Sequence, residues 1–335
     1  MHYVEFPALG WHIPLNDTLA QFTLFGAEFT IKWYGIIIAL GFMLAVIFGL
    51  RQARRFGIDP DRMIDVVLVC TVLGFVGARL YYVLFSDERA EFFADPVSIL
   101  YIWKGGIGIY GGIIAAFLSG ILMCRLRKID TLAMFDLTAL GFLIGQGIGR
   151  WGNFFNQEAF GGNTTLPWGM TGDIIQSGVN GKGYDPSLPV HPTFLYESLW
   201  CLLGFVLLFM LFQKAYKFKG QIFSLYVIWY GTARFFIELL RTDSLMMGNM
   251  KISCFVAVLA VLGGLMLYVM FKNRANSSPK ALVADGPTIT LEQVQEEAAE
   301  PVAELIGEDV ADEESVAELA ALDGAEEEDL NGDNT

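Results

Sequence analysis

Charged side chains are scarce in this chain. Asp, Glu, Lys and Arg make up only 17% of its 335 residues and 54% are hydrophobic, whereas soluble domains carry about 25% charged residues. The charges are also unevenly placed. Residues 276–335 hold 18 of the 36 acidic residues and one of the 22 basic ones, which leaves residues 1–275 with a net charge of +3. This excludes a soluble acidic enzyme, and residues 1–275 lack the basic density of a nucleic-acid-binding protein.

Residues that commonly bind metals are few and scattered. The chain has three histidines, and its four cysteines lie 54, 77 and 53 residues apart, at Cys70, Cys124, Cys201 and Cys254. These spacings match no metal signature. Each cysteine lies within or at the end of an apolar run, as expected for buried packing. The sequence therefore predicts neither a metal nor another cofactor.

Long apolar runs recur through residues 1–275. A helix needs about 20 apolar residues to cross a bilayer. Seven runs approach that length, at residues 33–50, 64–85, 107–124, 132–148, 195–212, 222–240 and 252–271. They predict an all-α polytopic membrane domain with seven transmembrane helices over residues 1–275. Residues 276–335 are acidic and contain no aromatic residue, so they are predicted to form a disordered tail.

Basic residues concentrate in alternate loops. The loops after the first, third and fifth runs, together with the segment after the seventh, carry 12 Lys and Arg residues, whereas residues 151–194 contain only Lys182. Cytoplasmic loops are the ones enriched in Lys and Arg. The pattern therefore predicts that the N-terminus lies outside, and that the C-terminus and the acidic tail are cytoplasmic.

Polar residues that are costly in a membrane recur at one depth. An ionisable side chain in a membrane helix marks a candidate functional site, and its depth follows from the helical rise of about 1.5 Å per residue. The predicted helices bring the following residues to the outer half of the membrane: Tyr34, Arg79, Tyr110, Arg150, Asn153, Glu158, His191, Glu197, Arg234 and Glu238. We expect a polar site at the depth of the lipid head groups.

Several of these residues also have an ordinary structural interpretation. Arg234 and Glu238 lie four residues apart and can pair on one helix face. Arg150 can extend to head groups, His191 can cap a loop, and Tyr34 can belong to an interfacial aromatic belt. Three arginines, three glutamates and a histidine in one layer nevertheless favour a polar ligand or an internal ionic network.

Six motifs of this sequence resemble those of the bacterial prolipoprotein diacylglyceryl transferases and occur in the same order. They are WYG at 33–35, GARLYYVLF at 77–85, KGGIGIYGG at 104–112, GRWGNFFNQE at 149–158, HPTFLYE at 191–197 and YGTARFFIELLR at 230–241. The motif at 149–158 is the most specific. The resemblance covers roughly residues 20–271 and leaves out the acidic tail.

The resemblance implies an enzyme of the bacterial plasma membrane. Such an enzyme transfers the diacylglyceryl group of phosphatidylglycerol to the lipobox cysteine of a prolipoprotein signal peptide and releases glycerol 1-phosphate. Its partners would be phosphatidylglycerol, prolipoproteins and the bilayer. With the depth argument, the resemblance predicts catalytic roles for Arg150, Arg234, Tyr110, Glu158 and Glu238. It predicts substrate binding by Arg150, Asn153, Gly161, Tyr34, Tyr230, Arg79, His191 and Glu197.

The chemistry of such a transfer suits these residue types. The acceptor thiol has an ordinary pKa of about 8.5 and must lose its proton. The departing phosphate gains negative charge, which paired guanidiniums can stabilise. The proton acceptor stays open among Tyr110, His191, Glu158 and Glu197. Many relatives have histidine where this chain has Tyr110, and we expect this hydroxyl to position the substrate by hydrogen bonding.

Two other functions fit parts of the pattern. A transporter or lipid-binding membrane protein would also carry polar residues in its helices. Transport sites, however, typically lie near the midplane between inverted repeats, and this sequence shows an off-centre cluster without a convincing repeat. An intramembrane hydrolase would need Ser, His and an acid at suitable depths, and no such combination is apparent.

Overall fold

The computed structural model describes residues 2–24, 27–86, 89–101, 105–242, 246–247 and 250–277. The acidic tail beyond Ser277 and Lys104 of the KGGIGIYGG motif lie outside the described residues.

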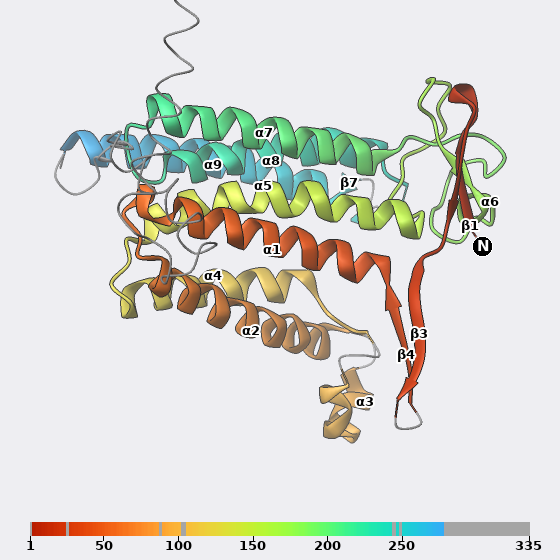
Figure 1. Cartoon of the computed structure of the whole chain (residues 1–335), viewed down its shortest axis with the longest axis horizontal. Coiled ribbons are helices and arrows are strands. Elements are labelled where there is room, and N and C mark those ends of the chain that lie inside the picture. Colours follow the sequence, from red (N-terminus) through yellow and green to blue (C-terminus); the bar gives the residue numbers. More distant parts are fainter. Residues whose placement is uncertain are drawn as a thin grey trace, which may run out of the picture. The chain divides into compact units, whose positions relative to one another are not determined.

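All seven predicted membrane helices are present, which confirms the polytopic helical fold. They are α1 (Trp33–Ala53), α2 (Pro60–Phe85), α4 (Ile109–Leu126), α5 (Thr131–Asn156), α7 (Thr193–Ala215), α8 (Gln221–Leu240) and α9 (Ile252–Ser277). They run side by side along a common direction (Figure 1). Each is long and apolar enough to cross a membrane.

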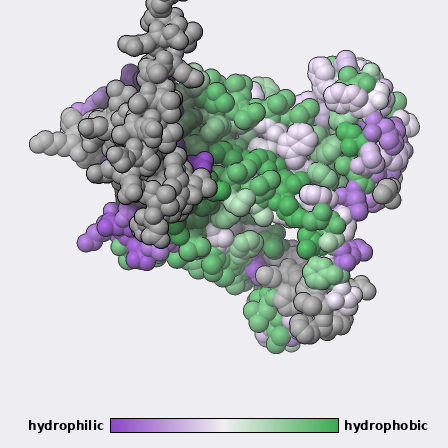
Figure 2. Space-filling model, viewed as in Figure 1, coloured by the Kyte–Doolittle hydropathy of each residue, from purple (hydrophilic) through white to green (hydrophobic). Residues whose placement is uncertain are grey.

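The sides of these helices expose large apolar residues. Leu68 and Phe75 of α2 are 59% and 63% exposed, and Leu118 of α4 is 61% exposed. Figure 2 shows hydrophobic side chains over the middle of the helical body, with hydrophilic ones towards its ends. A surface of this kind is stable in lipid rather than in water.

Helix α5 lies at the centre of the packing. It packs against α1, α7 and α8, whereas α2 pairs mainly with α4, and α8 also pairs with α9. Ala139, Leu140 and Leu143 of α5 are fully or almost fully buried. The central position of α5 directs the polar residues of its last turns towards neighbouring helices rather than lipid.

A buried carboxylate on α5 fixes the start of α8. Asp136 is fully buried and accepts hydrogen bonds from the Tyr216 hydroxyl at 2.6 Å, the Gly220 amide at 2.6 Å and the Phe223 amide at 2.7 Å. A negative charge at a helix N-terminus satisfies amides that lack intrahelical partners and interacts favourably with the helix dipole. This contact, which the sequence analysis did not anticipate, sets the position of α8 relative to α5.

Short strands, which the sequence analysis did not predict, accompany the helices. Strands β1 (His2–Phe6), β2 (Trp11–Leu15) and β5 (Thr171–Gly172) form an antiparallel sheet in the order β2-β1-β5, while β3 (Thr18–Leu24) pairs with β4 (Ala27–Lys32) and β6 (Met246–Met247) with β7 (Met250–Lys251). Two short helices, α3 (Arg89–Ala94) and α6 (Asp173–Gln176), lie between longer ones in the sequence. The strands lie near the end of the bundle where α1 begins and α5 ends, called the strand end below (Figure 1).

Gln157 joins this sheet to the end of α5. It adopts a left-handed conformation with φ of 48° and is fully buried. Its side-chain amide donates to the Tyr3 carbonyl at 3.0 Å and to Asp173 Oδ1 at 2.9 Å, while its oxygen accepts from the Ile174 amide at 3.1 Å. Gln157 therefore ends α5 at Asn156 and turns the chain so that Glu158 folds back on the helix.

The predicted orientation can be tested by cysteine labelling in intact cells. Lys182 and Lys217 are both exposed, and Lys217 lies in the loop between α7 and α8 at the other end of the bundle. An impermeant thiol reagent should label Lys182→Cys from outside and Lys217→Cys only after permeabilisation. The unsubstituted protein measures any background from its four cysteines. Labelling of Lys217→Cys in intact cells would contradict the predicted topology.

Candidate functional site

Three arginines meet around one glutamate at the strand end. Arg150 comes from α5, Arg234 from α8, and Arg241 directly follows α8, while Glu197 lies in the second turn of α7. Arg150 Nε forms an ion pair with Glu197 Oε2. Nη1 of Arg234 lies 3.4 Å from Glu197 Oε1, and Nη1 of Arg241 lies 4.0 Å from the same oxygen. Glu197 therefore links three guanidiniums that are distant in the sequence.

Arg234 also contacts a second carboxylate, that of Glu238. Its Nη2 lies 2.7 Å from Glu238 Oε2, one helical turn away. Glu197 is 5% exposed and Glu238 is 1% exposed. The pairing of Arg234 with Glu238 proposed from their spacing is present, but it is part of a larger network. Together with Arg150 and Arg241 these residues form the arginine cluster, whose three guanidiniums and two carboxylates have a formal charge of +1.

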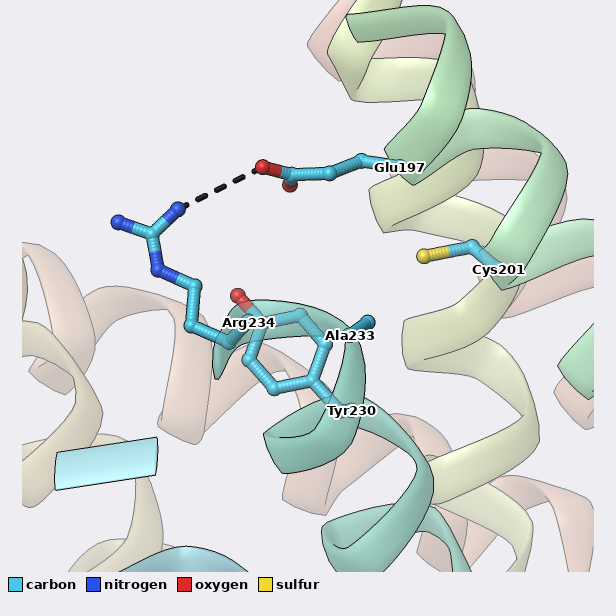
Figure 3. A pocket seen from close by; sticks show the side chains of 5 residues that line it. All are labelled: Glu197, Cys201, Tyr230, Ala233 and Arg234. Carbon is cyan, nitrogen blue, oxygen red and sulfur yellow. Dashed lines mark hydrogen bonds and ion pairs between the residues drawn. The ribbon is translucent and has the colours of Figure 1, made fainter. Parts of the chain in front are cut away.

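A small cavity adjoins the arginine cluster. It has a volume of about 10 Å³ and is lined by Glu197, Cys201, Tyr230, Ala233 and Arg234. In Figure 3 the Tyr230 hydroxyl points towards the Arg234 side chain, and the ion pair between Arg234 and Glu197 spans the gap between α8 and α7. This volume holds about one water molecule. Tyr230 thus lies where its hydroxyl can reach a group bound by Arg234.

The end of α5 builds a second polar group beside the arginines. Asn153 and Asn156 donate their side-chain amides to Glu158 Oε1 at 2.9 and 3.1 Å. Tyr34, the second residue of α1, packs against the same last turns of α5. A Cβ at Gly152 would lie 2.7 Å from Cδ2 of the Tyr34 ring, so only glycine allows the ring to approach this closely. The structure therefore brings the predicted residues Tyr34, Asn153 and Glu158 close to Arg150.

Gly161 connects the elements on which the arginine cluster is built. Its amide donates to the His191 carbonyl at 2.9 Å, and the amide of Gly162 donates to the Leu240 carbonyl at 2.9 Å. A Cβ at Gly161 would lie 2.8 Å from His191 Cβ and 3.1 Å from the Leu240 oxygen. Gly161 thus acts through its backbone and small size, by holding the start of α7 close to the end of α8.

The His191 imidazole is directed at Tyr196. Its Nδ1 lies 3.1 Å from the Tyr196 hydroxyl, which also accepts a hydrogen bond from the Trp168 indole at 2.8 Å. Partial burial lowers the pKa of His191 below its ordinary value near 6.5, because burial disfavours the charged form. The imidazole is therefore neutral at pH 7 and able to accept a proton, but its contacts place it beside Tyr196.

Arg79 and Tyr110 belong to the pair of α2 and α4, and the structure does not bring them into the arginine cluster. The Arg79 guanidinium, with Arg79 only 7% exposed, donates to the carbonyls of residues 98, 99, 105 and 106 at 2.8–2.9 Å. Tyr110 is 44% exposed, and its ring centroid lies 6.3 Å from that of Tyr81. These contacts indicate that Arg79 holds the loop before α4, at whose start Tyr110 lies. The substrate-binding role of Arg79 and the catalytic role of Tyr110 stay predictions.

Two basic residues of this region were absent from the predicted site. Arg241 lies three residues after Glu238 and seven after Arg234, a spacing that places all three on one helix face and could have revealed it. Lys251 donates its ammonium to the carbonyls of Glu238 at 2.6 Å and Arg241 at 2.7 Å. A cation at these carbonyls satisfies the C-terminal end of α8. Lys251 therefore stabilises the segment that carries Glu238 and Arg241.

The fold and the site together define a polytopic membrane protein with an arginine cluster at one end of its helices. Among the described residues, no group of three or more His, Cys, Asp or Glu residues is arranged to hold a metal ion. The family model described as "Prolipoprotein diacylglyceryl transferase" matches residues 21–270. The chain therefore belongs to the prolipoprotein diacylglyceryl transferase family.

The regions that match curated relatives span most of each relative's length. The chain is 38% identical over 260 residues to the phosphatidylglycerol–prolipoprotein diacylglyceryl transferase of Clostridioides difficile strain 630. These residues cover 77% of this chain and 97% of the relative. It is 40% identical over 259 residues to transferase 1 of Clostridium perfringens strain 13, with 76% and 95% covered. It is 41% identical over 250 residues to the Limosilactobacillus reuteri DSM 20016 transferase, with 74% and 90% covered. The chain is a multi-pass protein of the bacterial plasma membrane.

Proposed function

We propose that this chain transfers the diacylglyceryl group of phosphatidylglycerol to the lipobox cysteine thiol of a prolipoprotein signal peptide. The observation that carries the proposal is the arginine cluster, because it keeps a formal charge of +1 at the end of a bundle that belongs in lipid. A phosphodiester head group supplies the matching negative charge. The names of the relatives state the same donor and acceptor classes.

The bond changes explain why positive charge is needed. The cysteine sulfur attacks the glyceryl carbon that carries the phosphate, and the carbon–oxygen bond to the phosphate breaks. The thiol loses its proton, and glycerol 1-phosphate leaves. The phosphate changes from a monoanion to a species approaching two negative charges. Arg150 and Arg234, held in place before the reaction by Glu197, stabilise this developing charge.

The thiol's proton needs an acceptor close to the phosphate. Glu197 has both carboxylate oxygens engaged by guanidiniums, and His191 faces Tyr196. Glu158 instead receives two neutral side-chain amides and lies in the group with Tyr34 and Arg150. Glu158 is therefore the carboxylate that we propose as the acceptor, with Tyr34 positioning the substrate beside it.

A reconstituted transfer assay tests the function directly. The purified protein is incubated in vesicles with phosphatidylglycerol and a peptide that contains a lipobox. The expected result is a thioether-linked diacylglyceryl peptide together with glycerol 1-phosphate in a one-to-one ratio. Controls are a peptide with Cys replaced by Ser and vesicles of phosphatidylcholine alone, and neither should give product. Binding of phosphatidylglycerol without any product would instead identify a lipid-binding protein.

A further inference from the structure

Two tryptophans fasten α7 to α8 through reciprocal hydrogen bonds. Trp200 Nε1 donates to the Trp229 carbonyl at 3.2 Å, and Trp229 Nε1 donates to the Trp200 carbonyl at 3.1 Å. The rings are stacked with their centroids 4.5 Å apart and an angle of 25° between their planes. Each tryptophan therefore binds the backbone of the helix that carries the other.

This tryptophan pair lies well within the length of its two helices rather than at their ends, where an interfacial aromatic belt would lie. Trp200 lies seven residues after the first residue of α7, and Trp229 lies eight after the first residue of α8. At about 1.5 Å per residue, each tryptophan is roughly 10–12 Å along its helix from that first residue. Water does not compete for an indole N–H at that depth, so the loss of its partner is costly.

The neighbouring helix is shaped to admit one of the rings. A Cβ at Gly204 of α7 would lie 2.3 Å from Trp229 Nε1 and 2.7 Å from its Cδ1. No side chain larger than hydrogen fits there without moving the indole. The tryptophan pair therefore allows one alignment of α7 against α8, because a shift of one residue would break both hydrogen bonds.

The same interface carries part of the arginine cluster. Glu197 lies three residues before Trp200 on α7, and Arg234 lies five residues after Trp229 on α8. The ion pair between these two crosses the interface at 3.4 Å. Cys201 and Tyr230, the immediate sequence neighbours of the tryptophans, line the small cavity beside that ion pair (Figure 3).

We propose that Trp200 and Trp229 are positioning residues for the transfer reaction. They fix the alignment of α7 and α8, which sets where Glu197 holds the Arg234 guanidinium. The inference rests on the proposed role of Arg234 in binding the phosphate. A displacement of about 1 Å at a reacting group can cost up to about 10²-fold in rate, so a small slip of the helices is enough to matter.

The test compares Trp200→Phe, Trp229→Phe and the double variant in the transfer assay. Phenylalanine keeps an aromatic ring but removes the N–H donor. Each single variant should lower kcat about tenfold and change KM for phosphatidylglycerol less than threefold, because the misplaced guanidinium matters most when charge develops. The double variant should be no more than about twofold worse than either single one, because both bonds maintain one alignment.

Two glycines that contact α8 from different neighbouring helices provide a matched control. Gly204→Ala should act like the tryptophan variants. Gly264→Ala on α9 is also crowded, since a Cβ there would lie 2.8 Å from Ile228 Cγ1, but it perturbs the side of α8 that packs against α9. It should lower the melting temperature as Gly204→Ala does while keeping kcat within threefold. Full kcat in the tryptophan variants, or an equal loss of kcat in Gly264→Ala, would overturn the proposal.

Measuring Arg234→Lys in the same series separates the positioning role of the tryptophans from the proposed binding of the phosphate by Arg234. If Arg234→Lys keeps the wild-type rate, the assignment of the phosphate site is wrong. If Arg234→Lys is strongly impaired while Trp200→Phe and Trp229→Phe are fully active, the site stands and only the positioning role is wrong.

Discussion

Replacing Arg150 or Arg234 by lysine should lower the transfer rate by about 10²–10³-fold, the cost of losing one preorganised donor to a developing negative charge. Arg234 uses separate nitrogens for Glu197 and Glu238, and a guanidinium has further N–H groups for a phosphate. Lysine offers one ammonium without this planar fork. It cannot keep both carboxylates and the phosphate in the same geometry.

The measurement is the initial rate of transfer to a lipobox peptide at saturating phosphatidylglycerol. Arg127→Lys is a suitable control, because Arg127 also forms an ion pair, with Asp65 at 3.0 Å, but follows α4 at the end of the bundle away from the strands. It should keep its rate within about twofold. If Arg234 and Glu238 only neutralise each other, the double variant Arg234→Leu, Glu238→Leu should recover substantial activity. That recovery would contradict a role of Arg234 in transfer.

The sequence was sufficient to predict the helices because each crossing of a bilayer requires a run of about 20 mostly apolar residues. Each of the seven apolar runs corresponds to a helix, and only the first two residues of the run at 107–124 lie outside it. The strands were missed because they are short and lie outside these runs, where no such requirement acts. Helix α5 extends to Asn156, eight residues beyond the apolar run at 132–148, and ends there because Gln157 turns the chain in a left-handed conformation.

The sequence predicts the depth in the membrane at which each candidate site residue lies, but not the direction in which its side chain faces around the helix. Helical rise gives the level of each polar residue, so Arg150, Glu197 and Arg234 were expected in one layer, and they form ion pairs there. Arg79 was expected in the same layer, yet its guanidinium binds loop carbonyls near α4. Which way a side chain faces depends on the packing of helices distant in sequence, and one sequence does not contain that information.

Glu197→Gln should cause the largest loss of stability among single changes in the arginine cluster. The buried carboxylate of Glu197 pairs with Arg150 and Arg234 and lies 4.0 Å from Arg241. Glutamine keeps the shape but removes the charge, so the partly buried guanidiniums lose the carboxylate that links them. Removing one partner of a buried ion pair typically costs about 3–5 kcal/mol. Thermal unfolding in phosphatidylcholine nanodiscs measures this loss.

The lipid dependence of that loss tests whether the arginines bind phosphate. A phosphatidylglycerol head group can restore the missing negative charge, and a ligand that binds only the folded state stabilises it. Adding phosphatidylglycerol should therefore raise the melting temperature of Glu197→Gln more than that of the wild type. Glu158→Gln is the matched control, because Glu158 is held by the amides of Asn153 and Asn156 rather than by guanidiniums, and it should show no extra gain. An equal shift in all three proteins would mean that the arginine cluster is a structural ion network that phosphatidylglycerol does not enter.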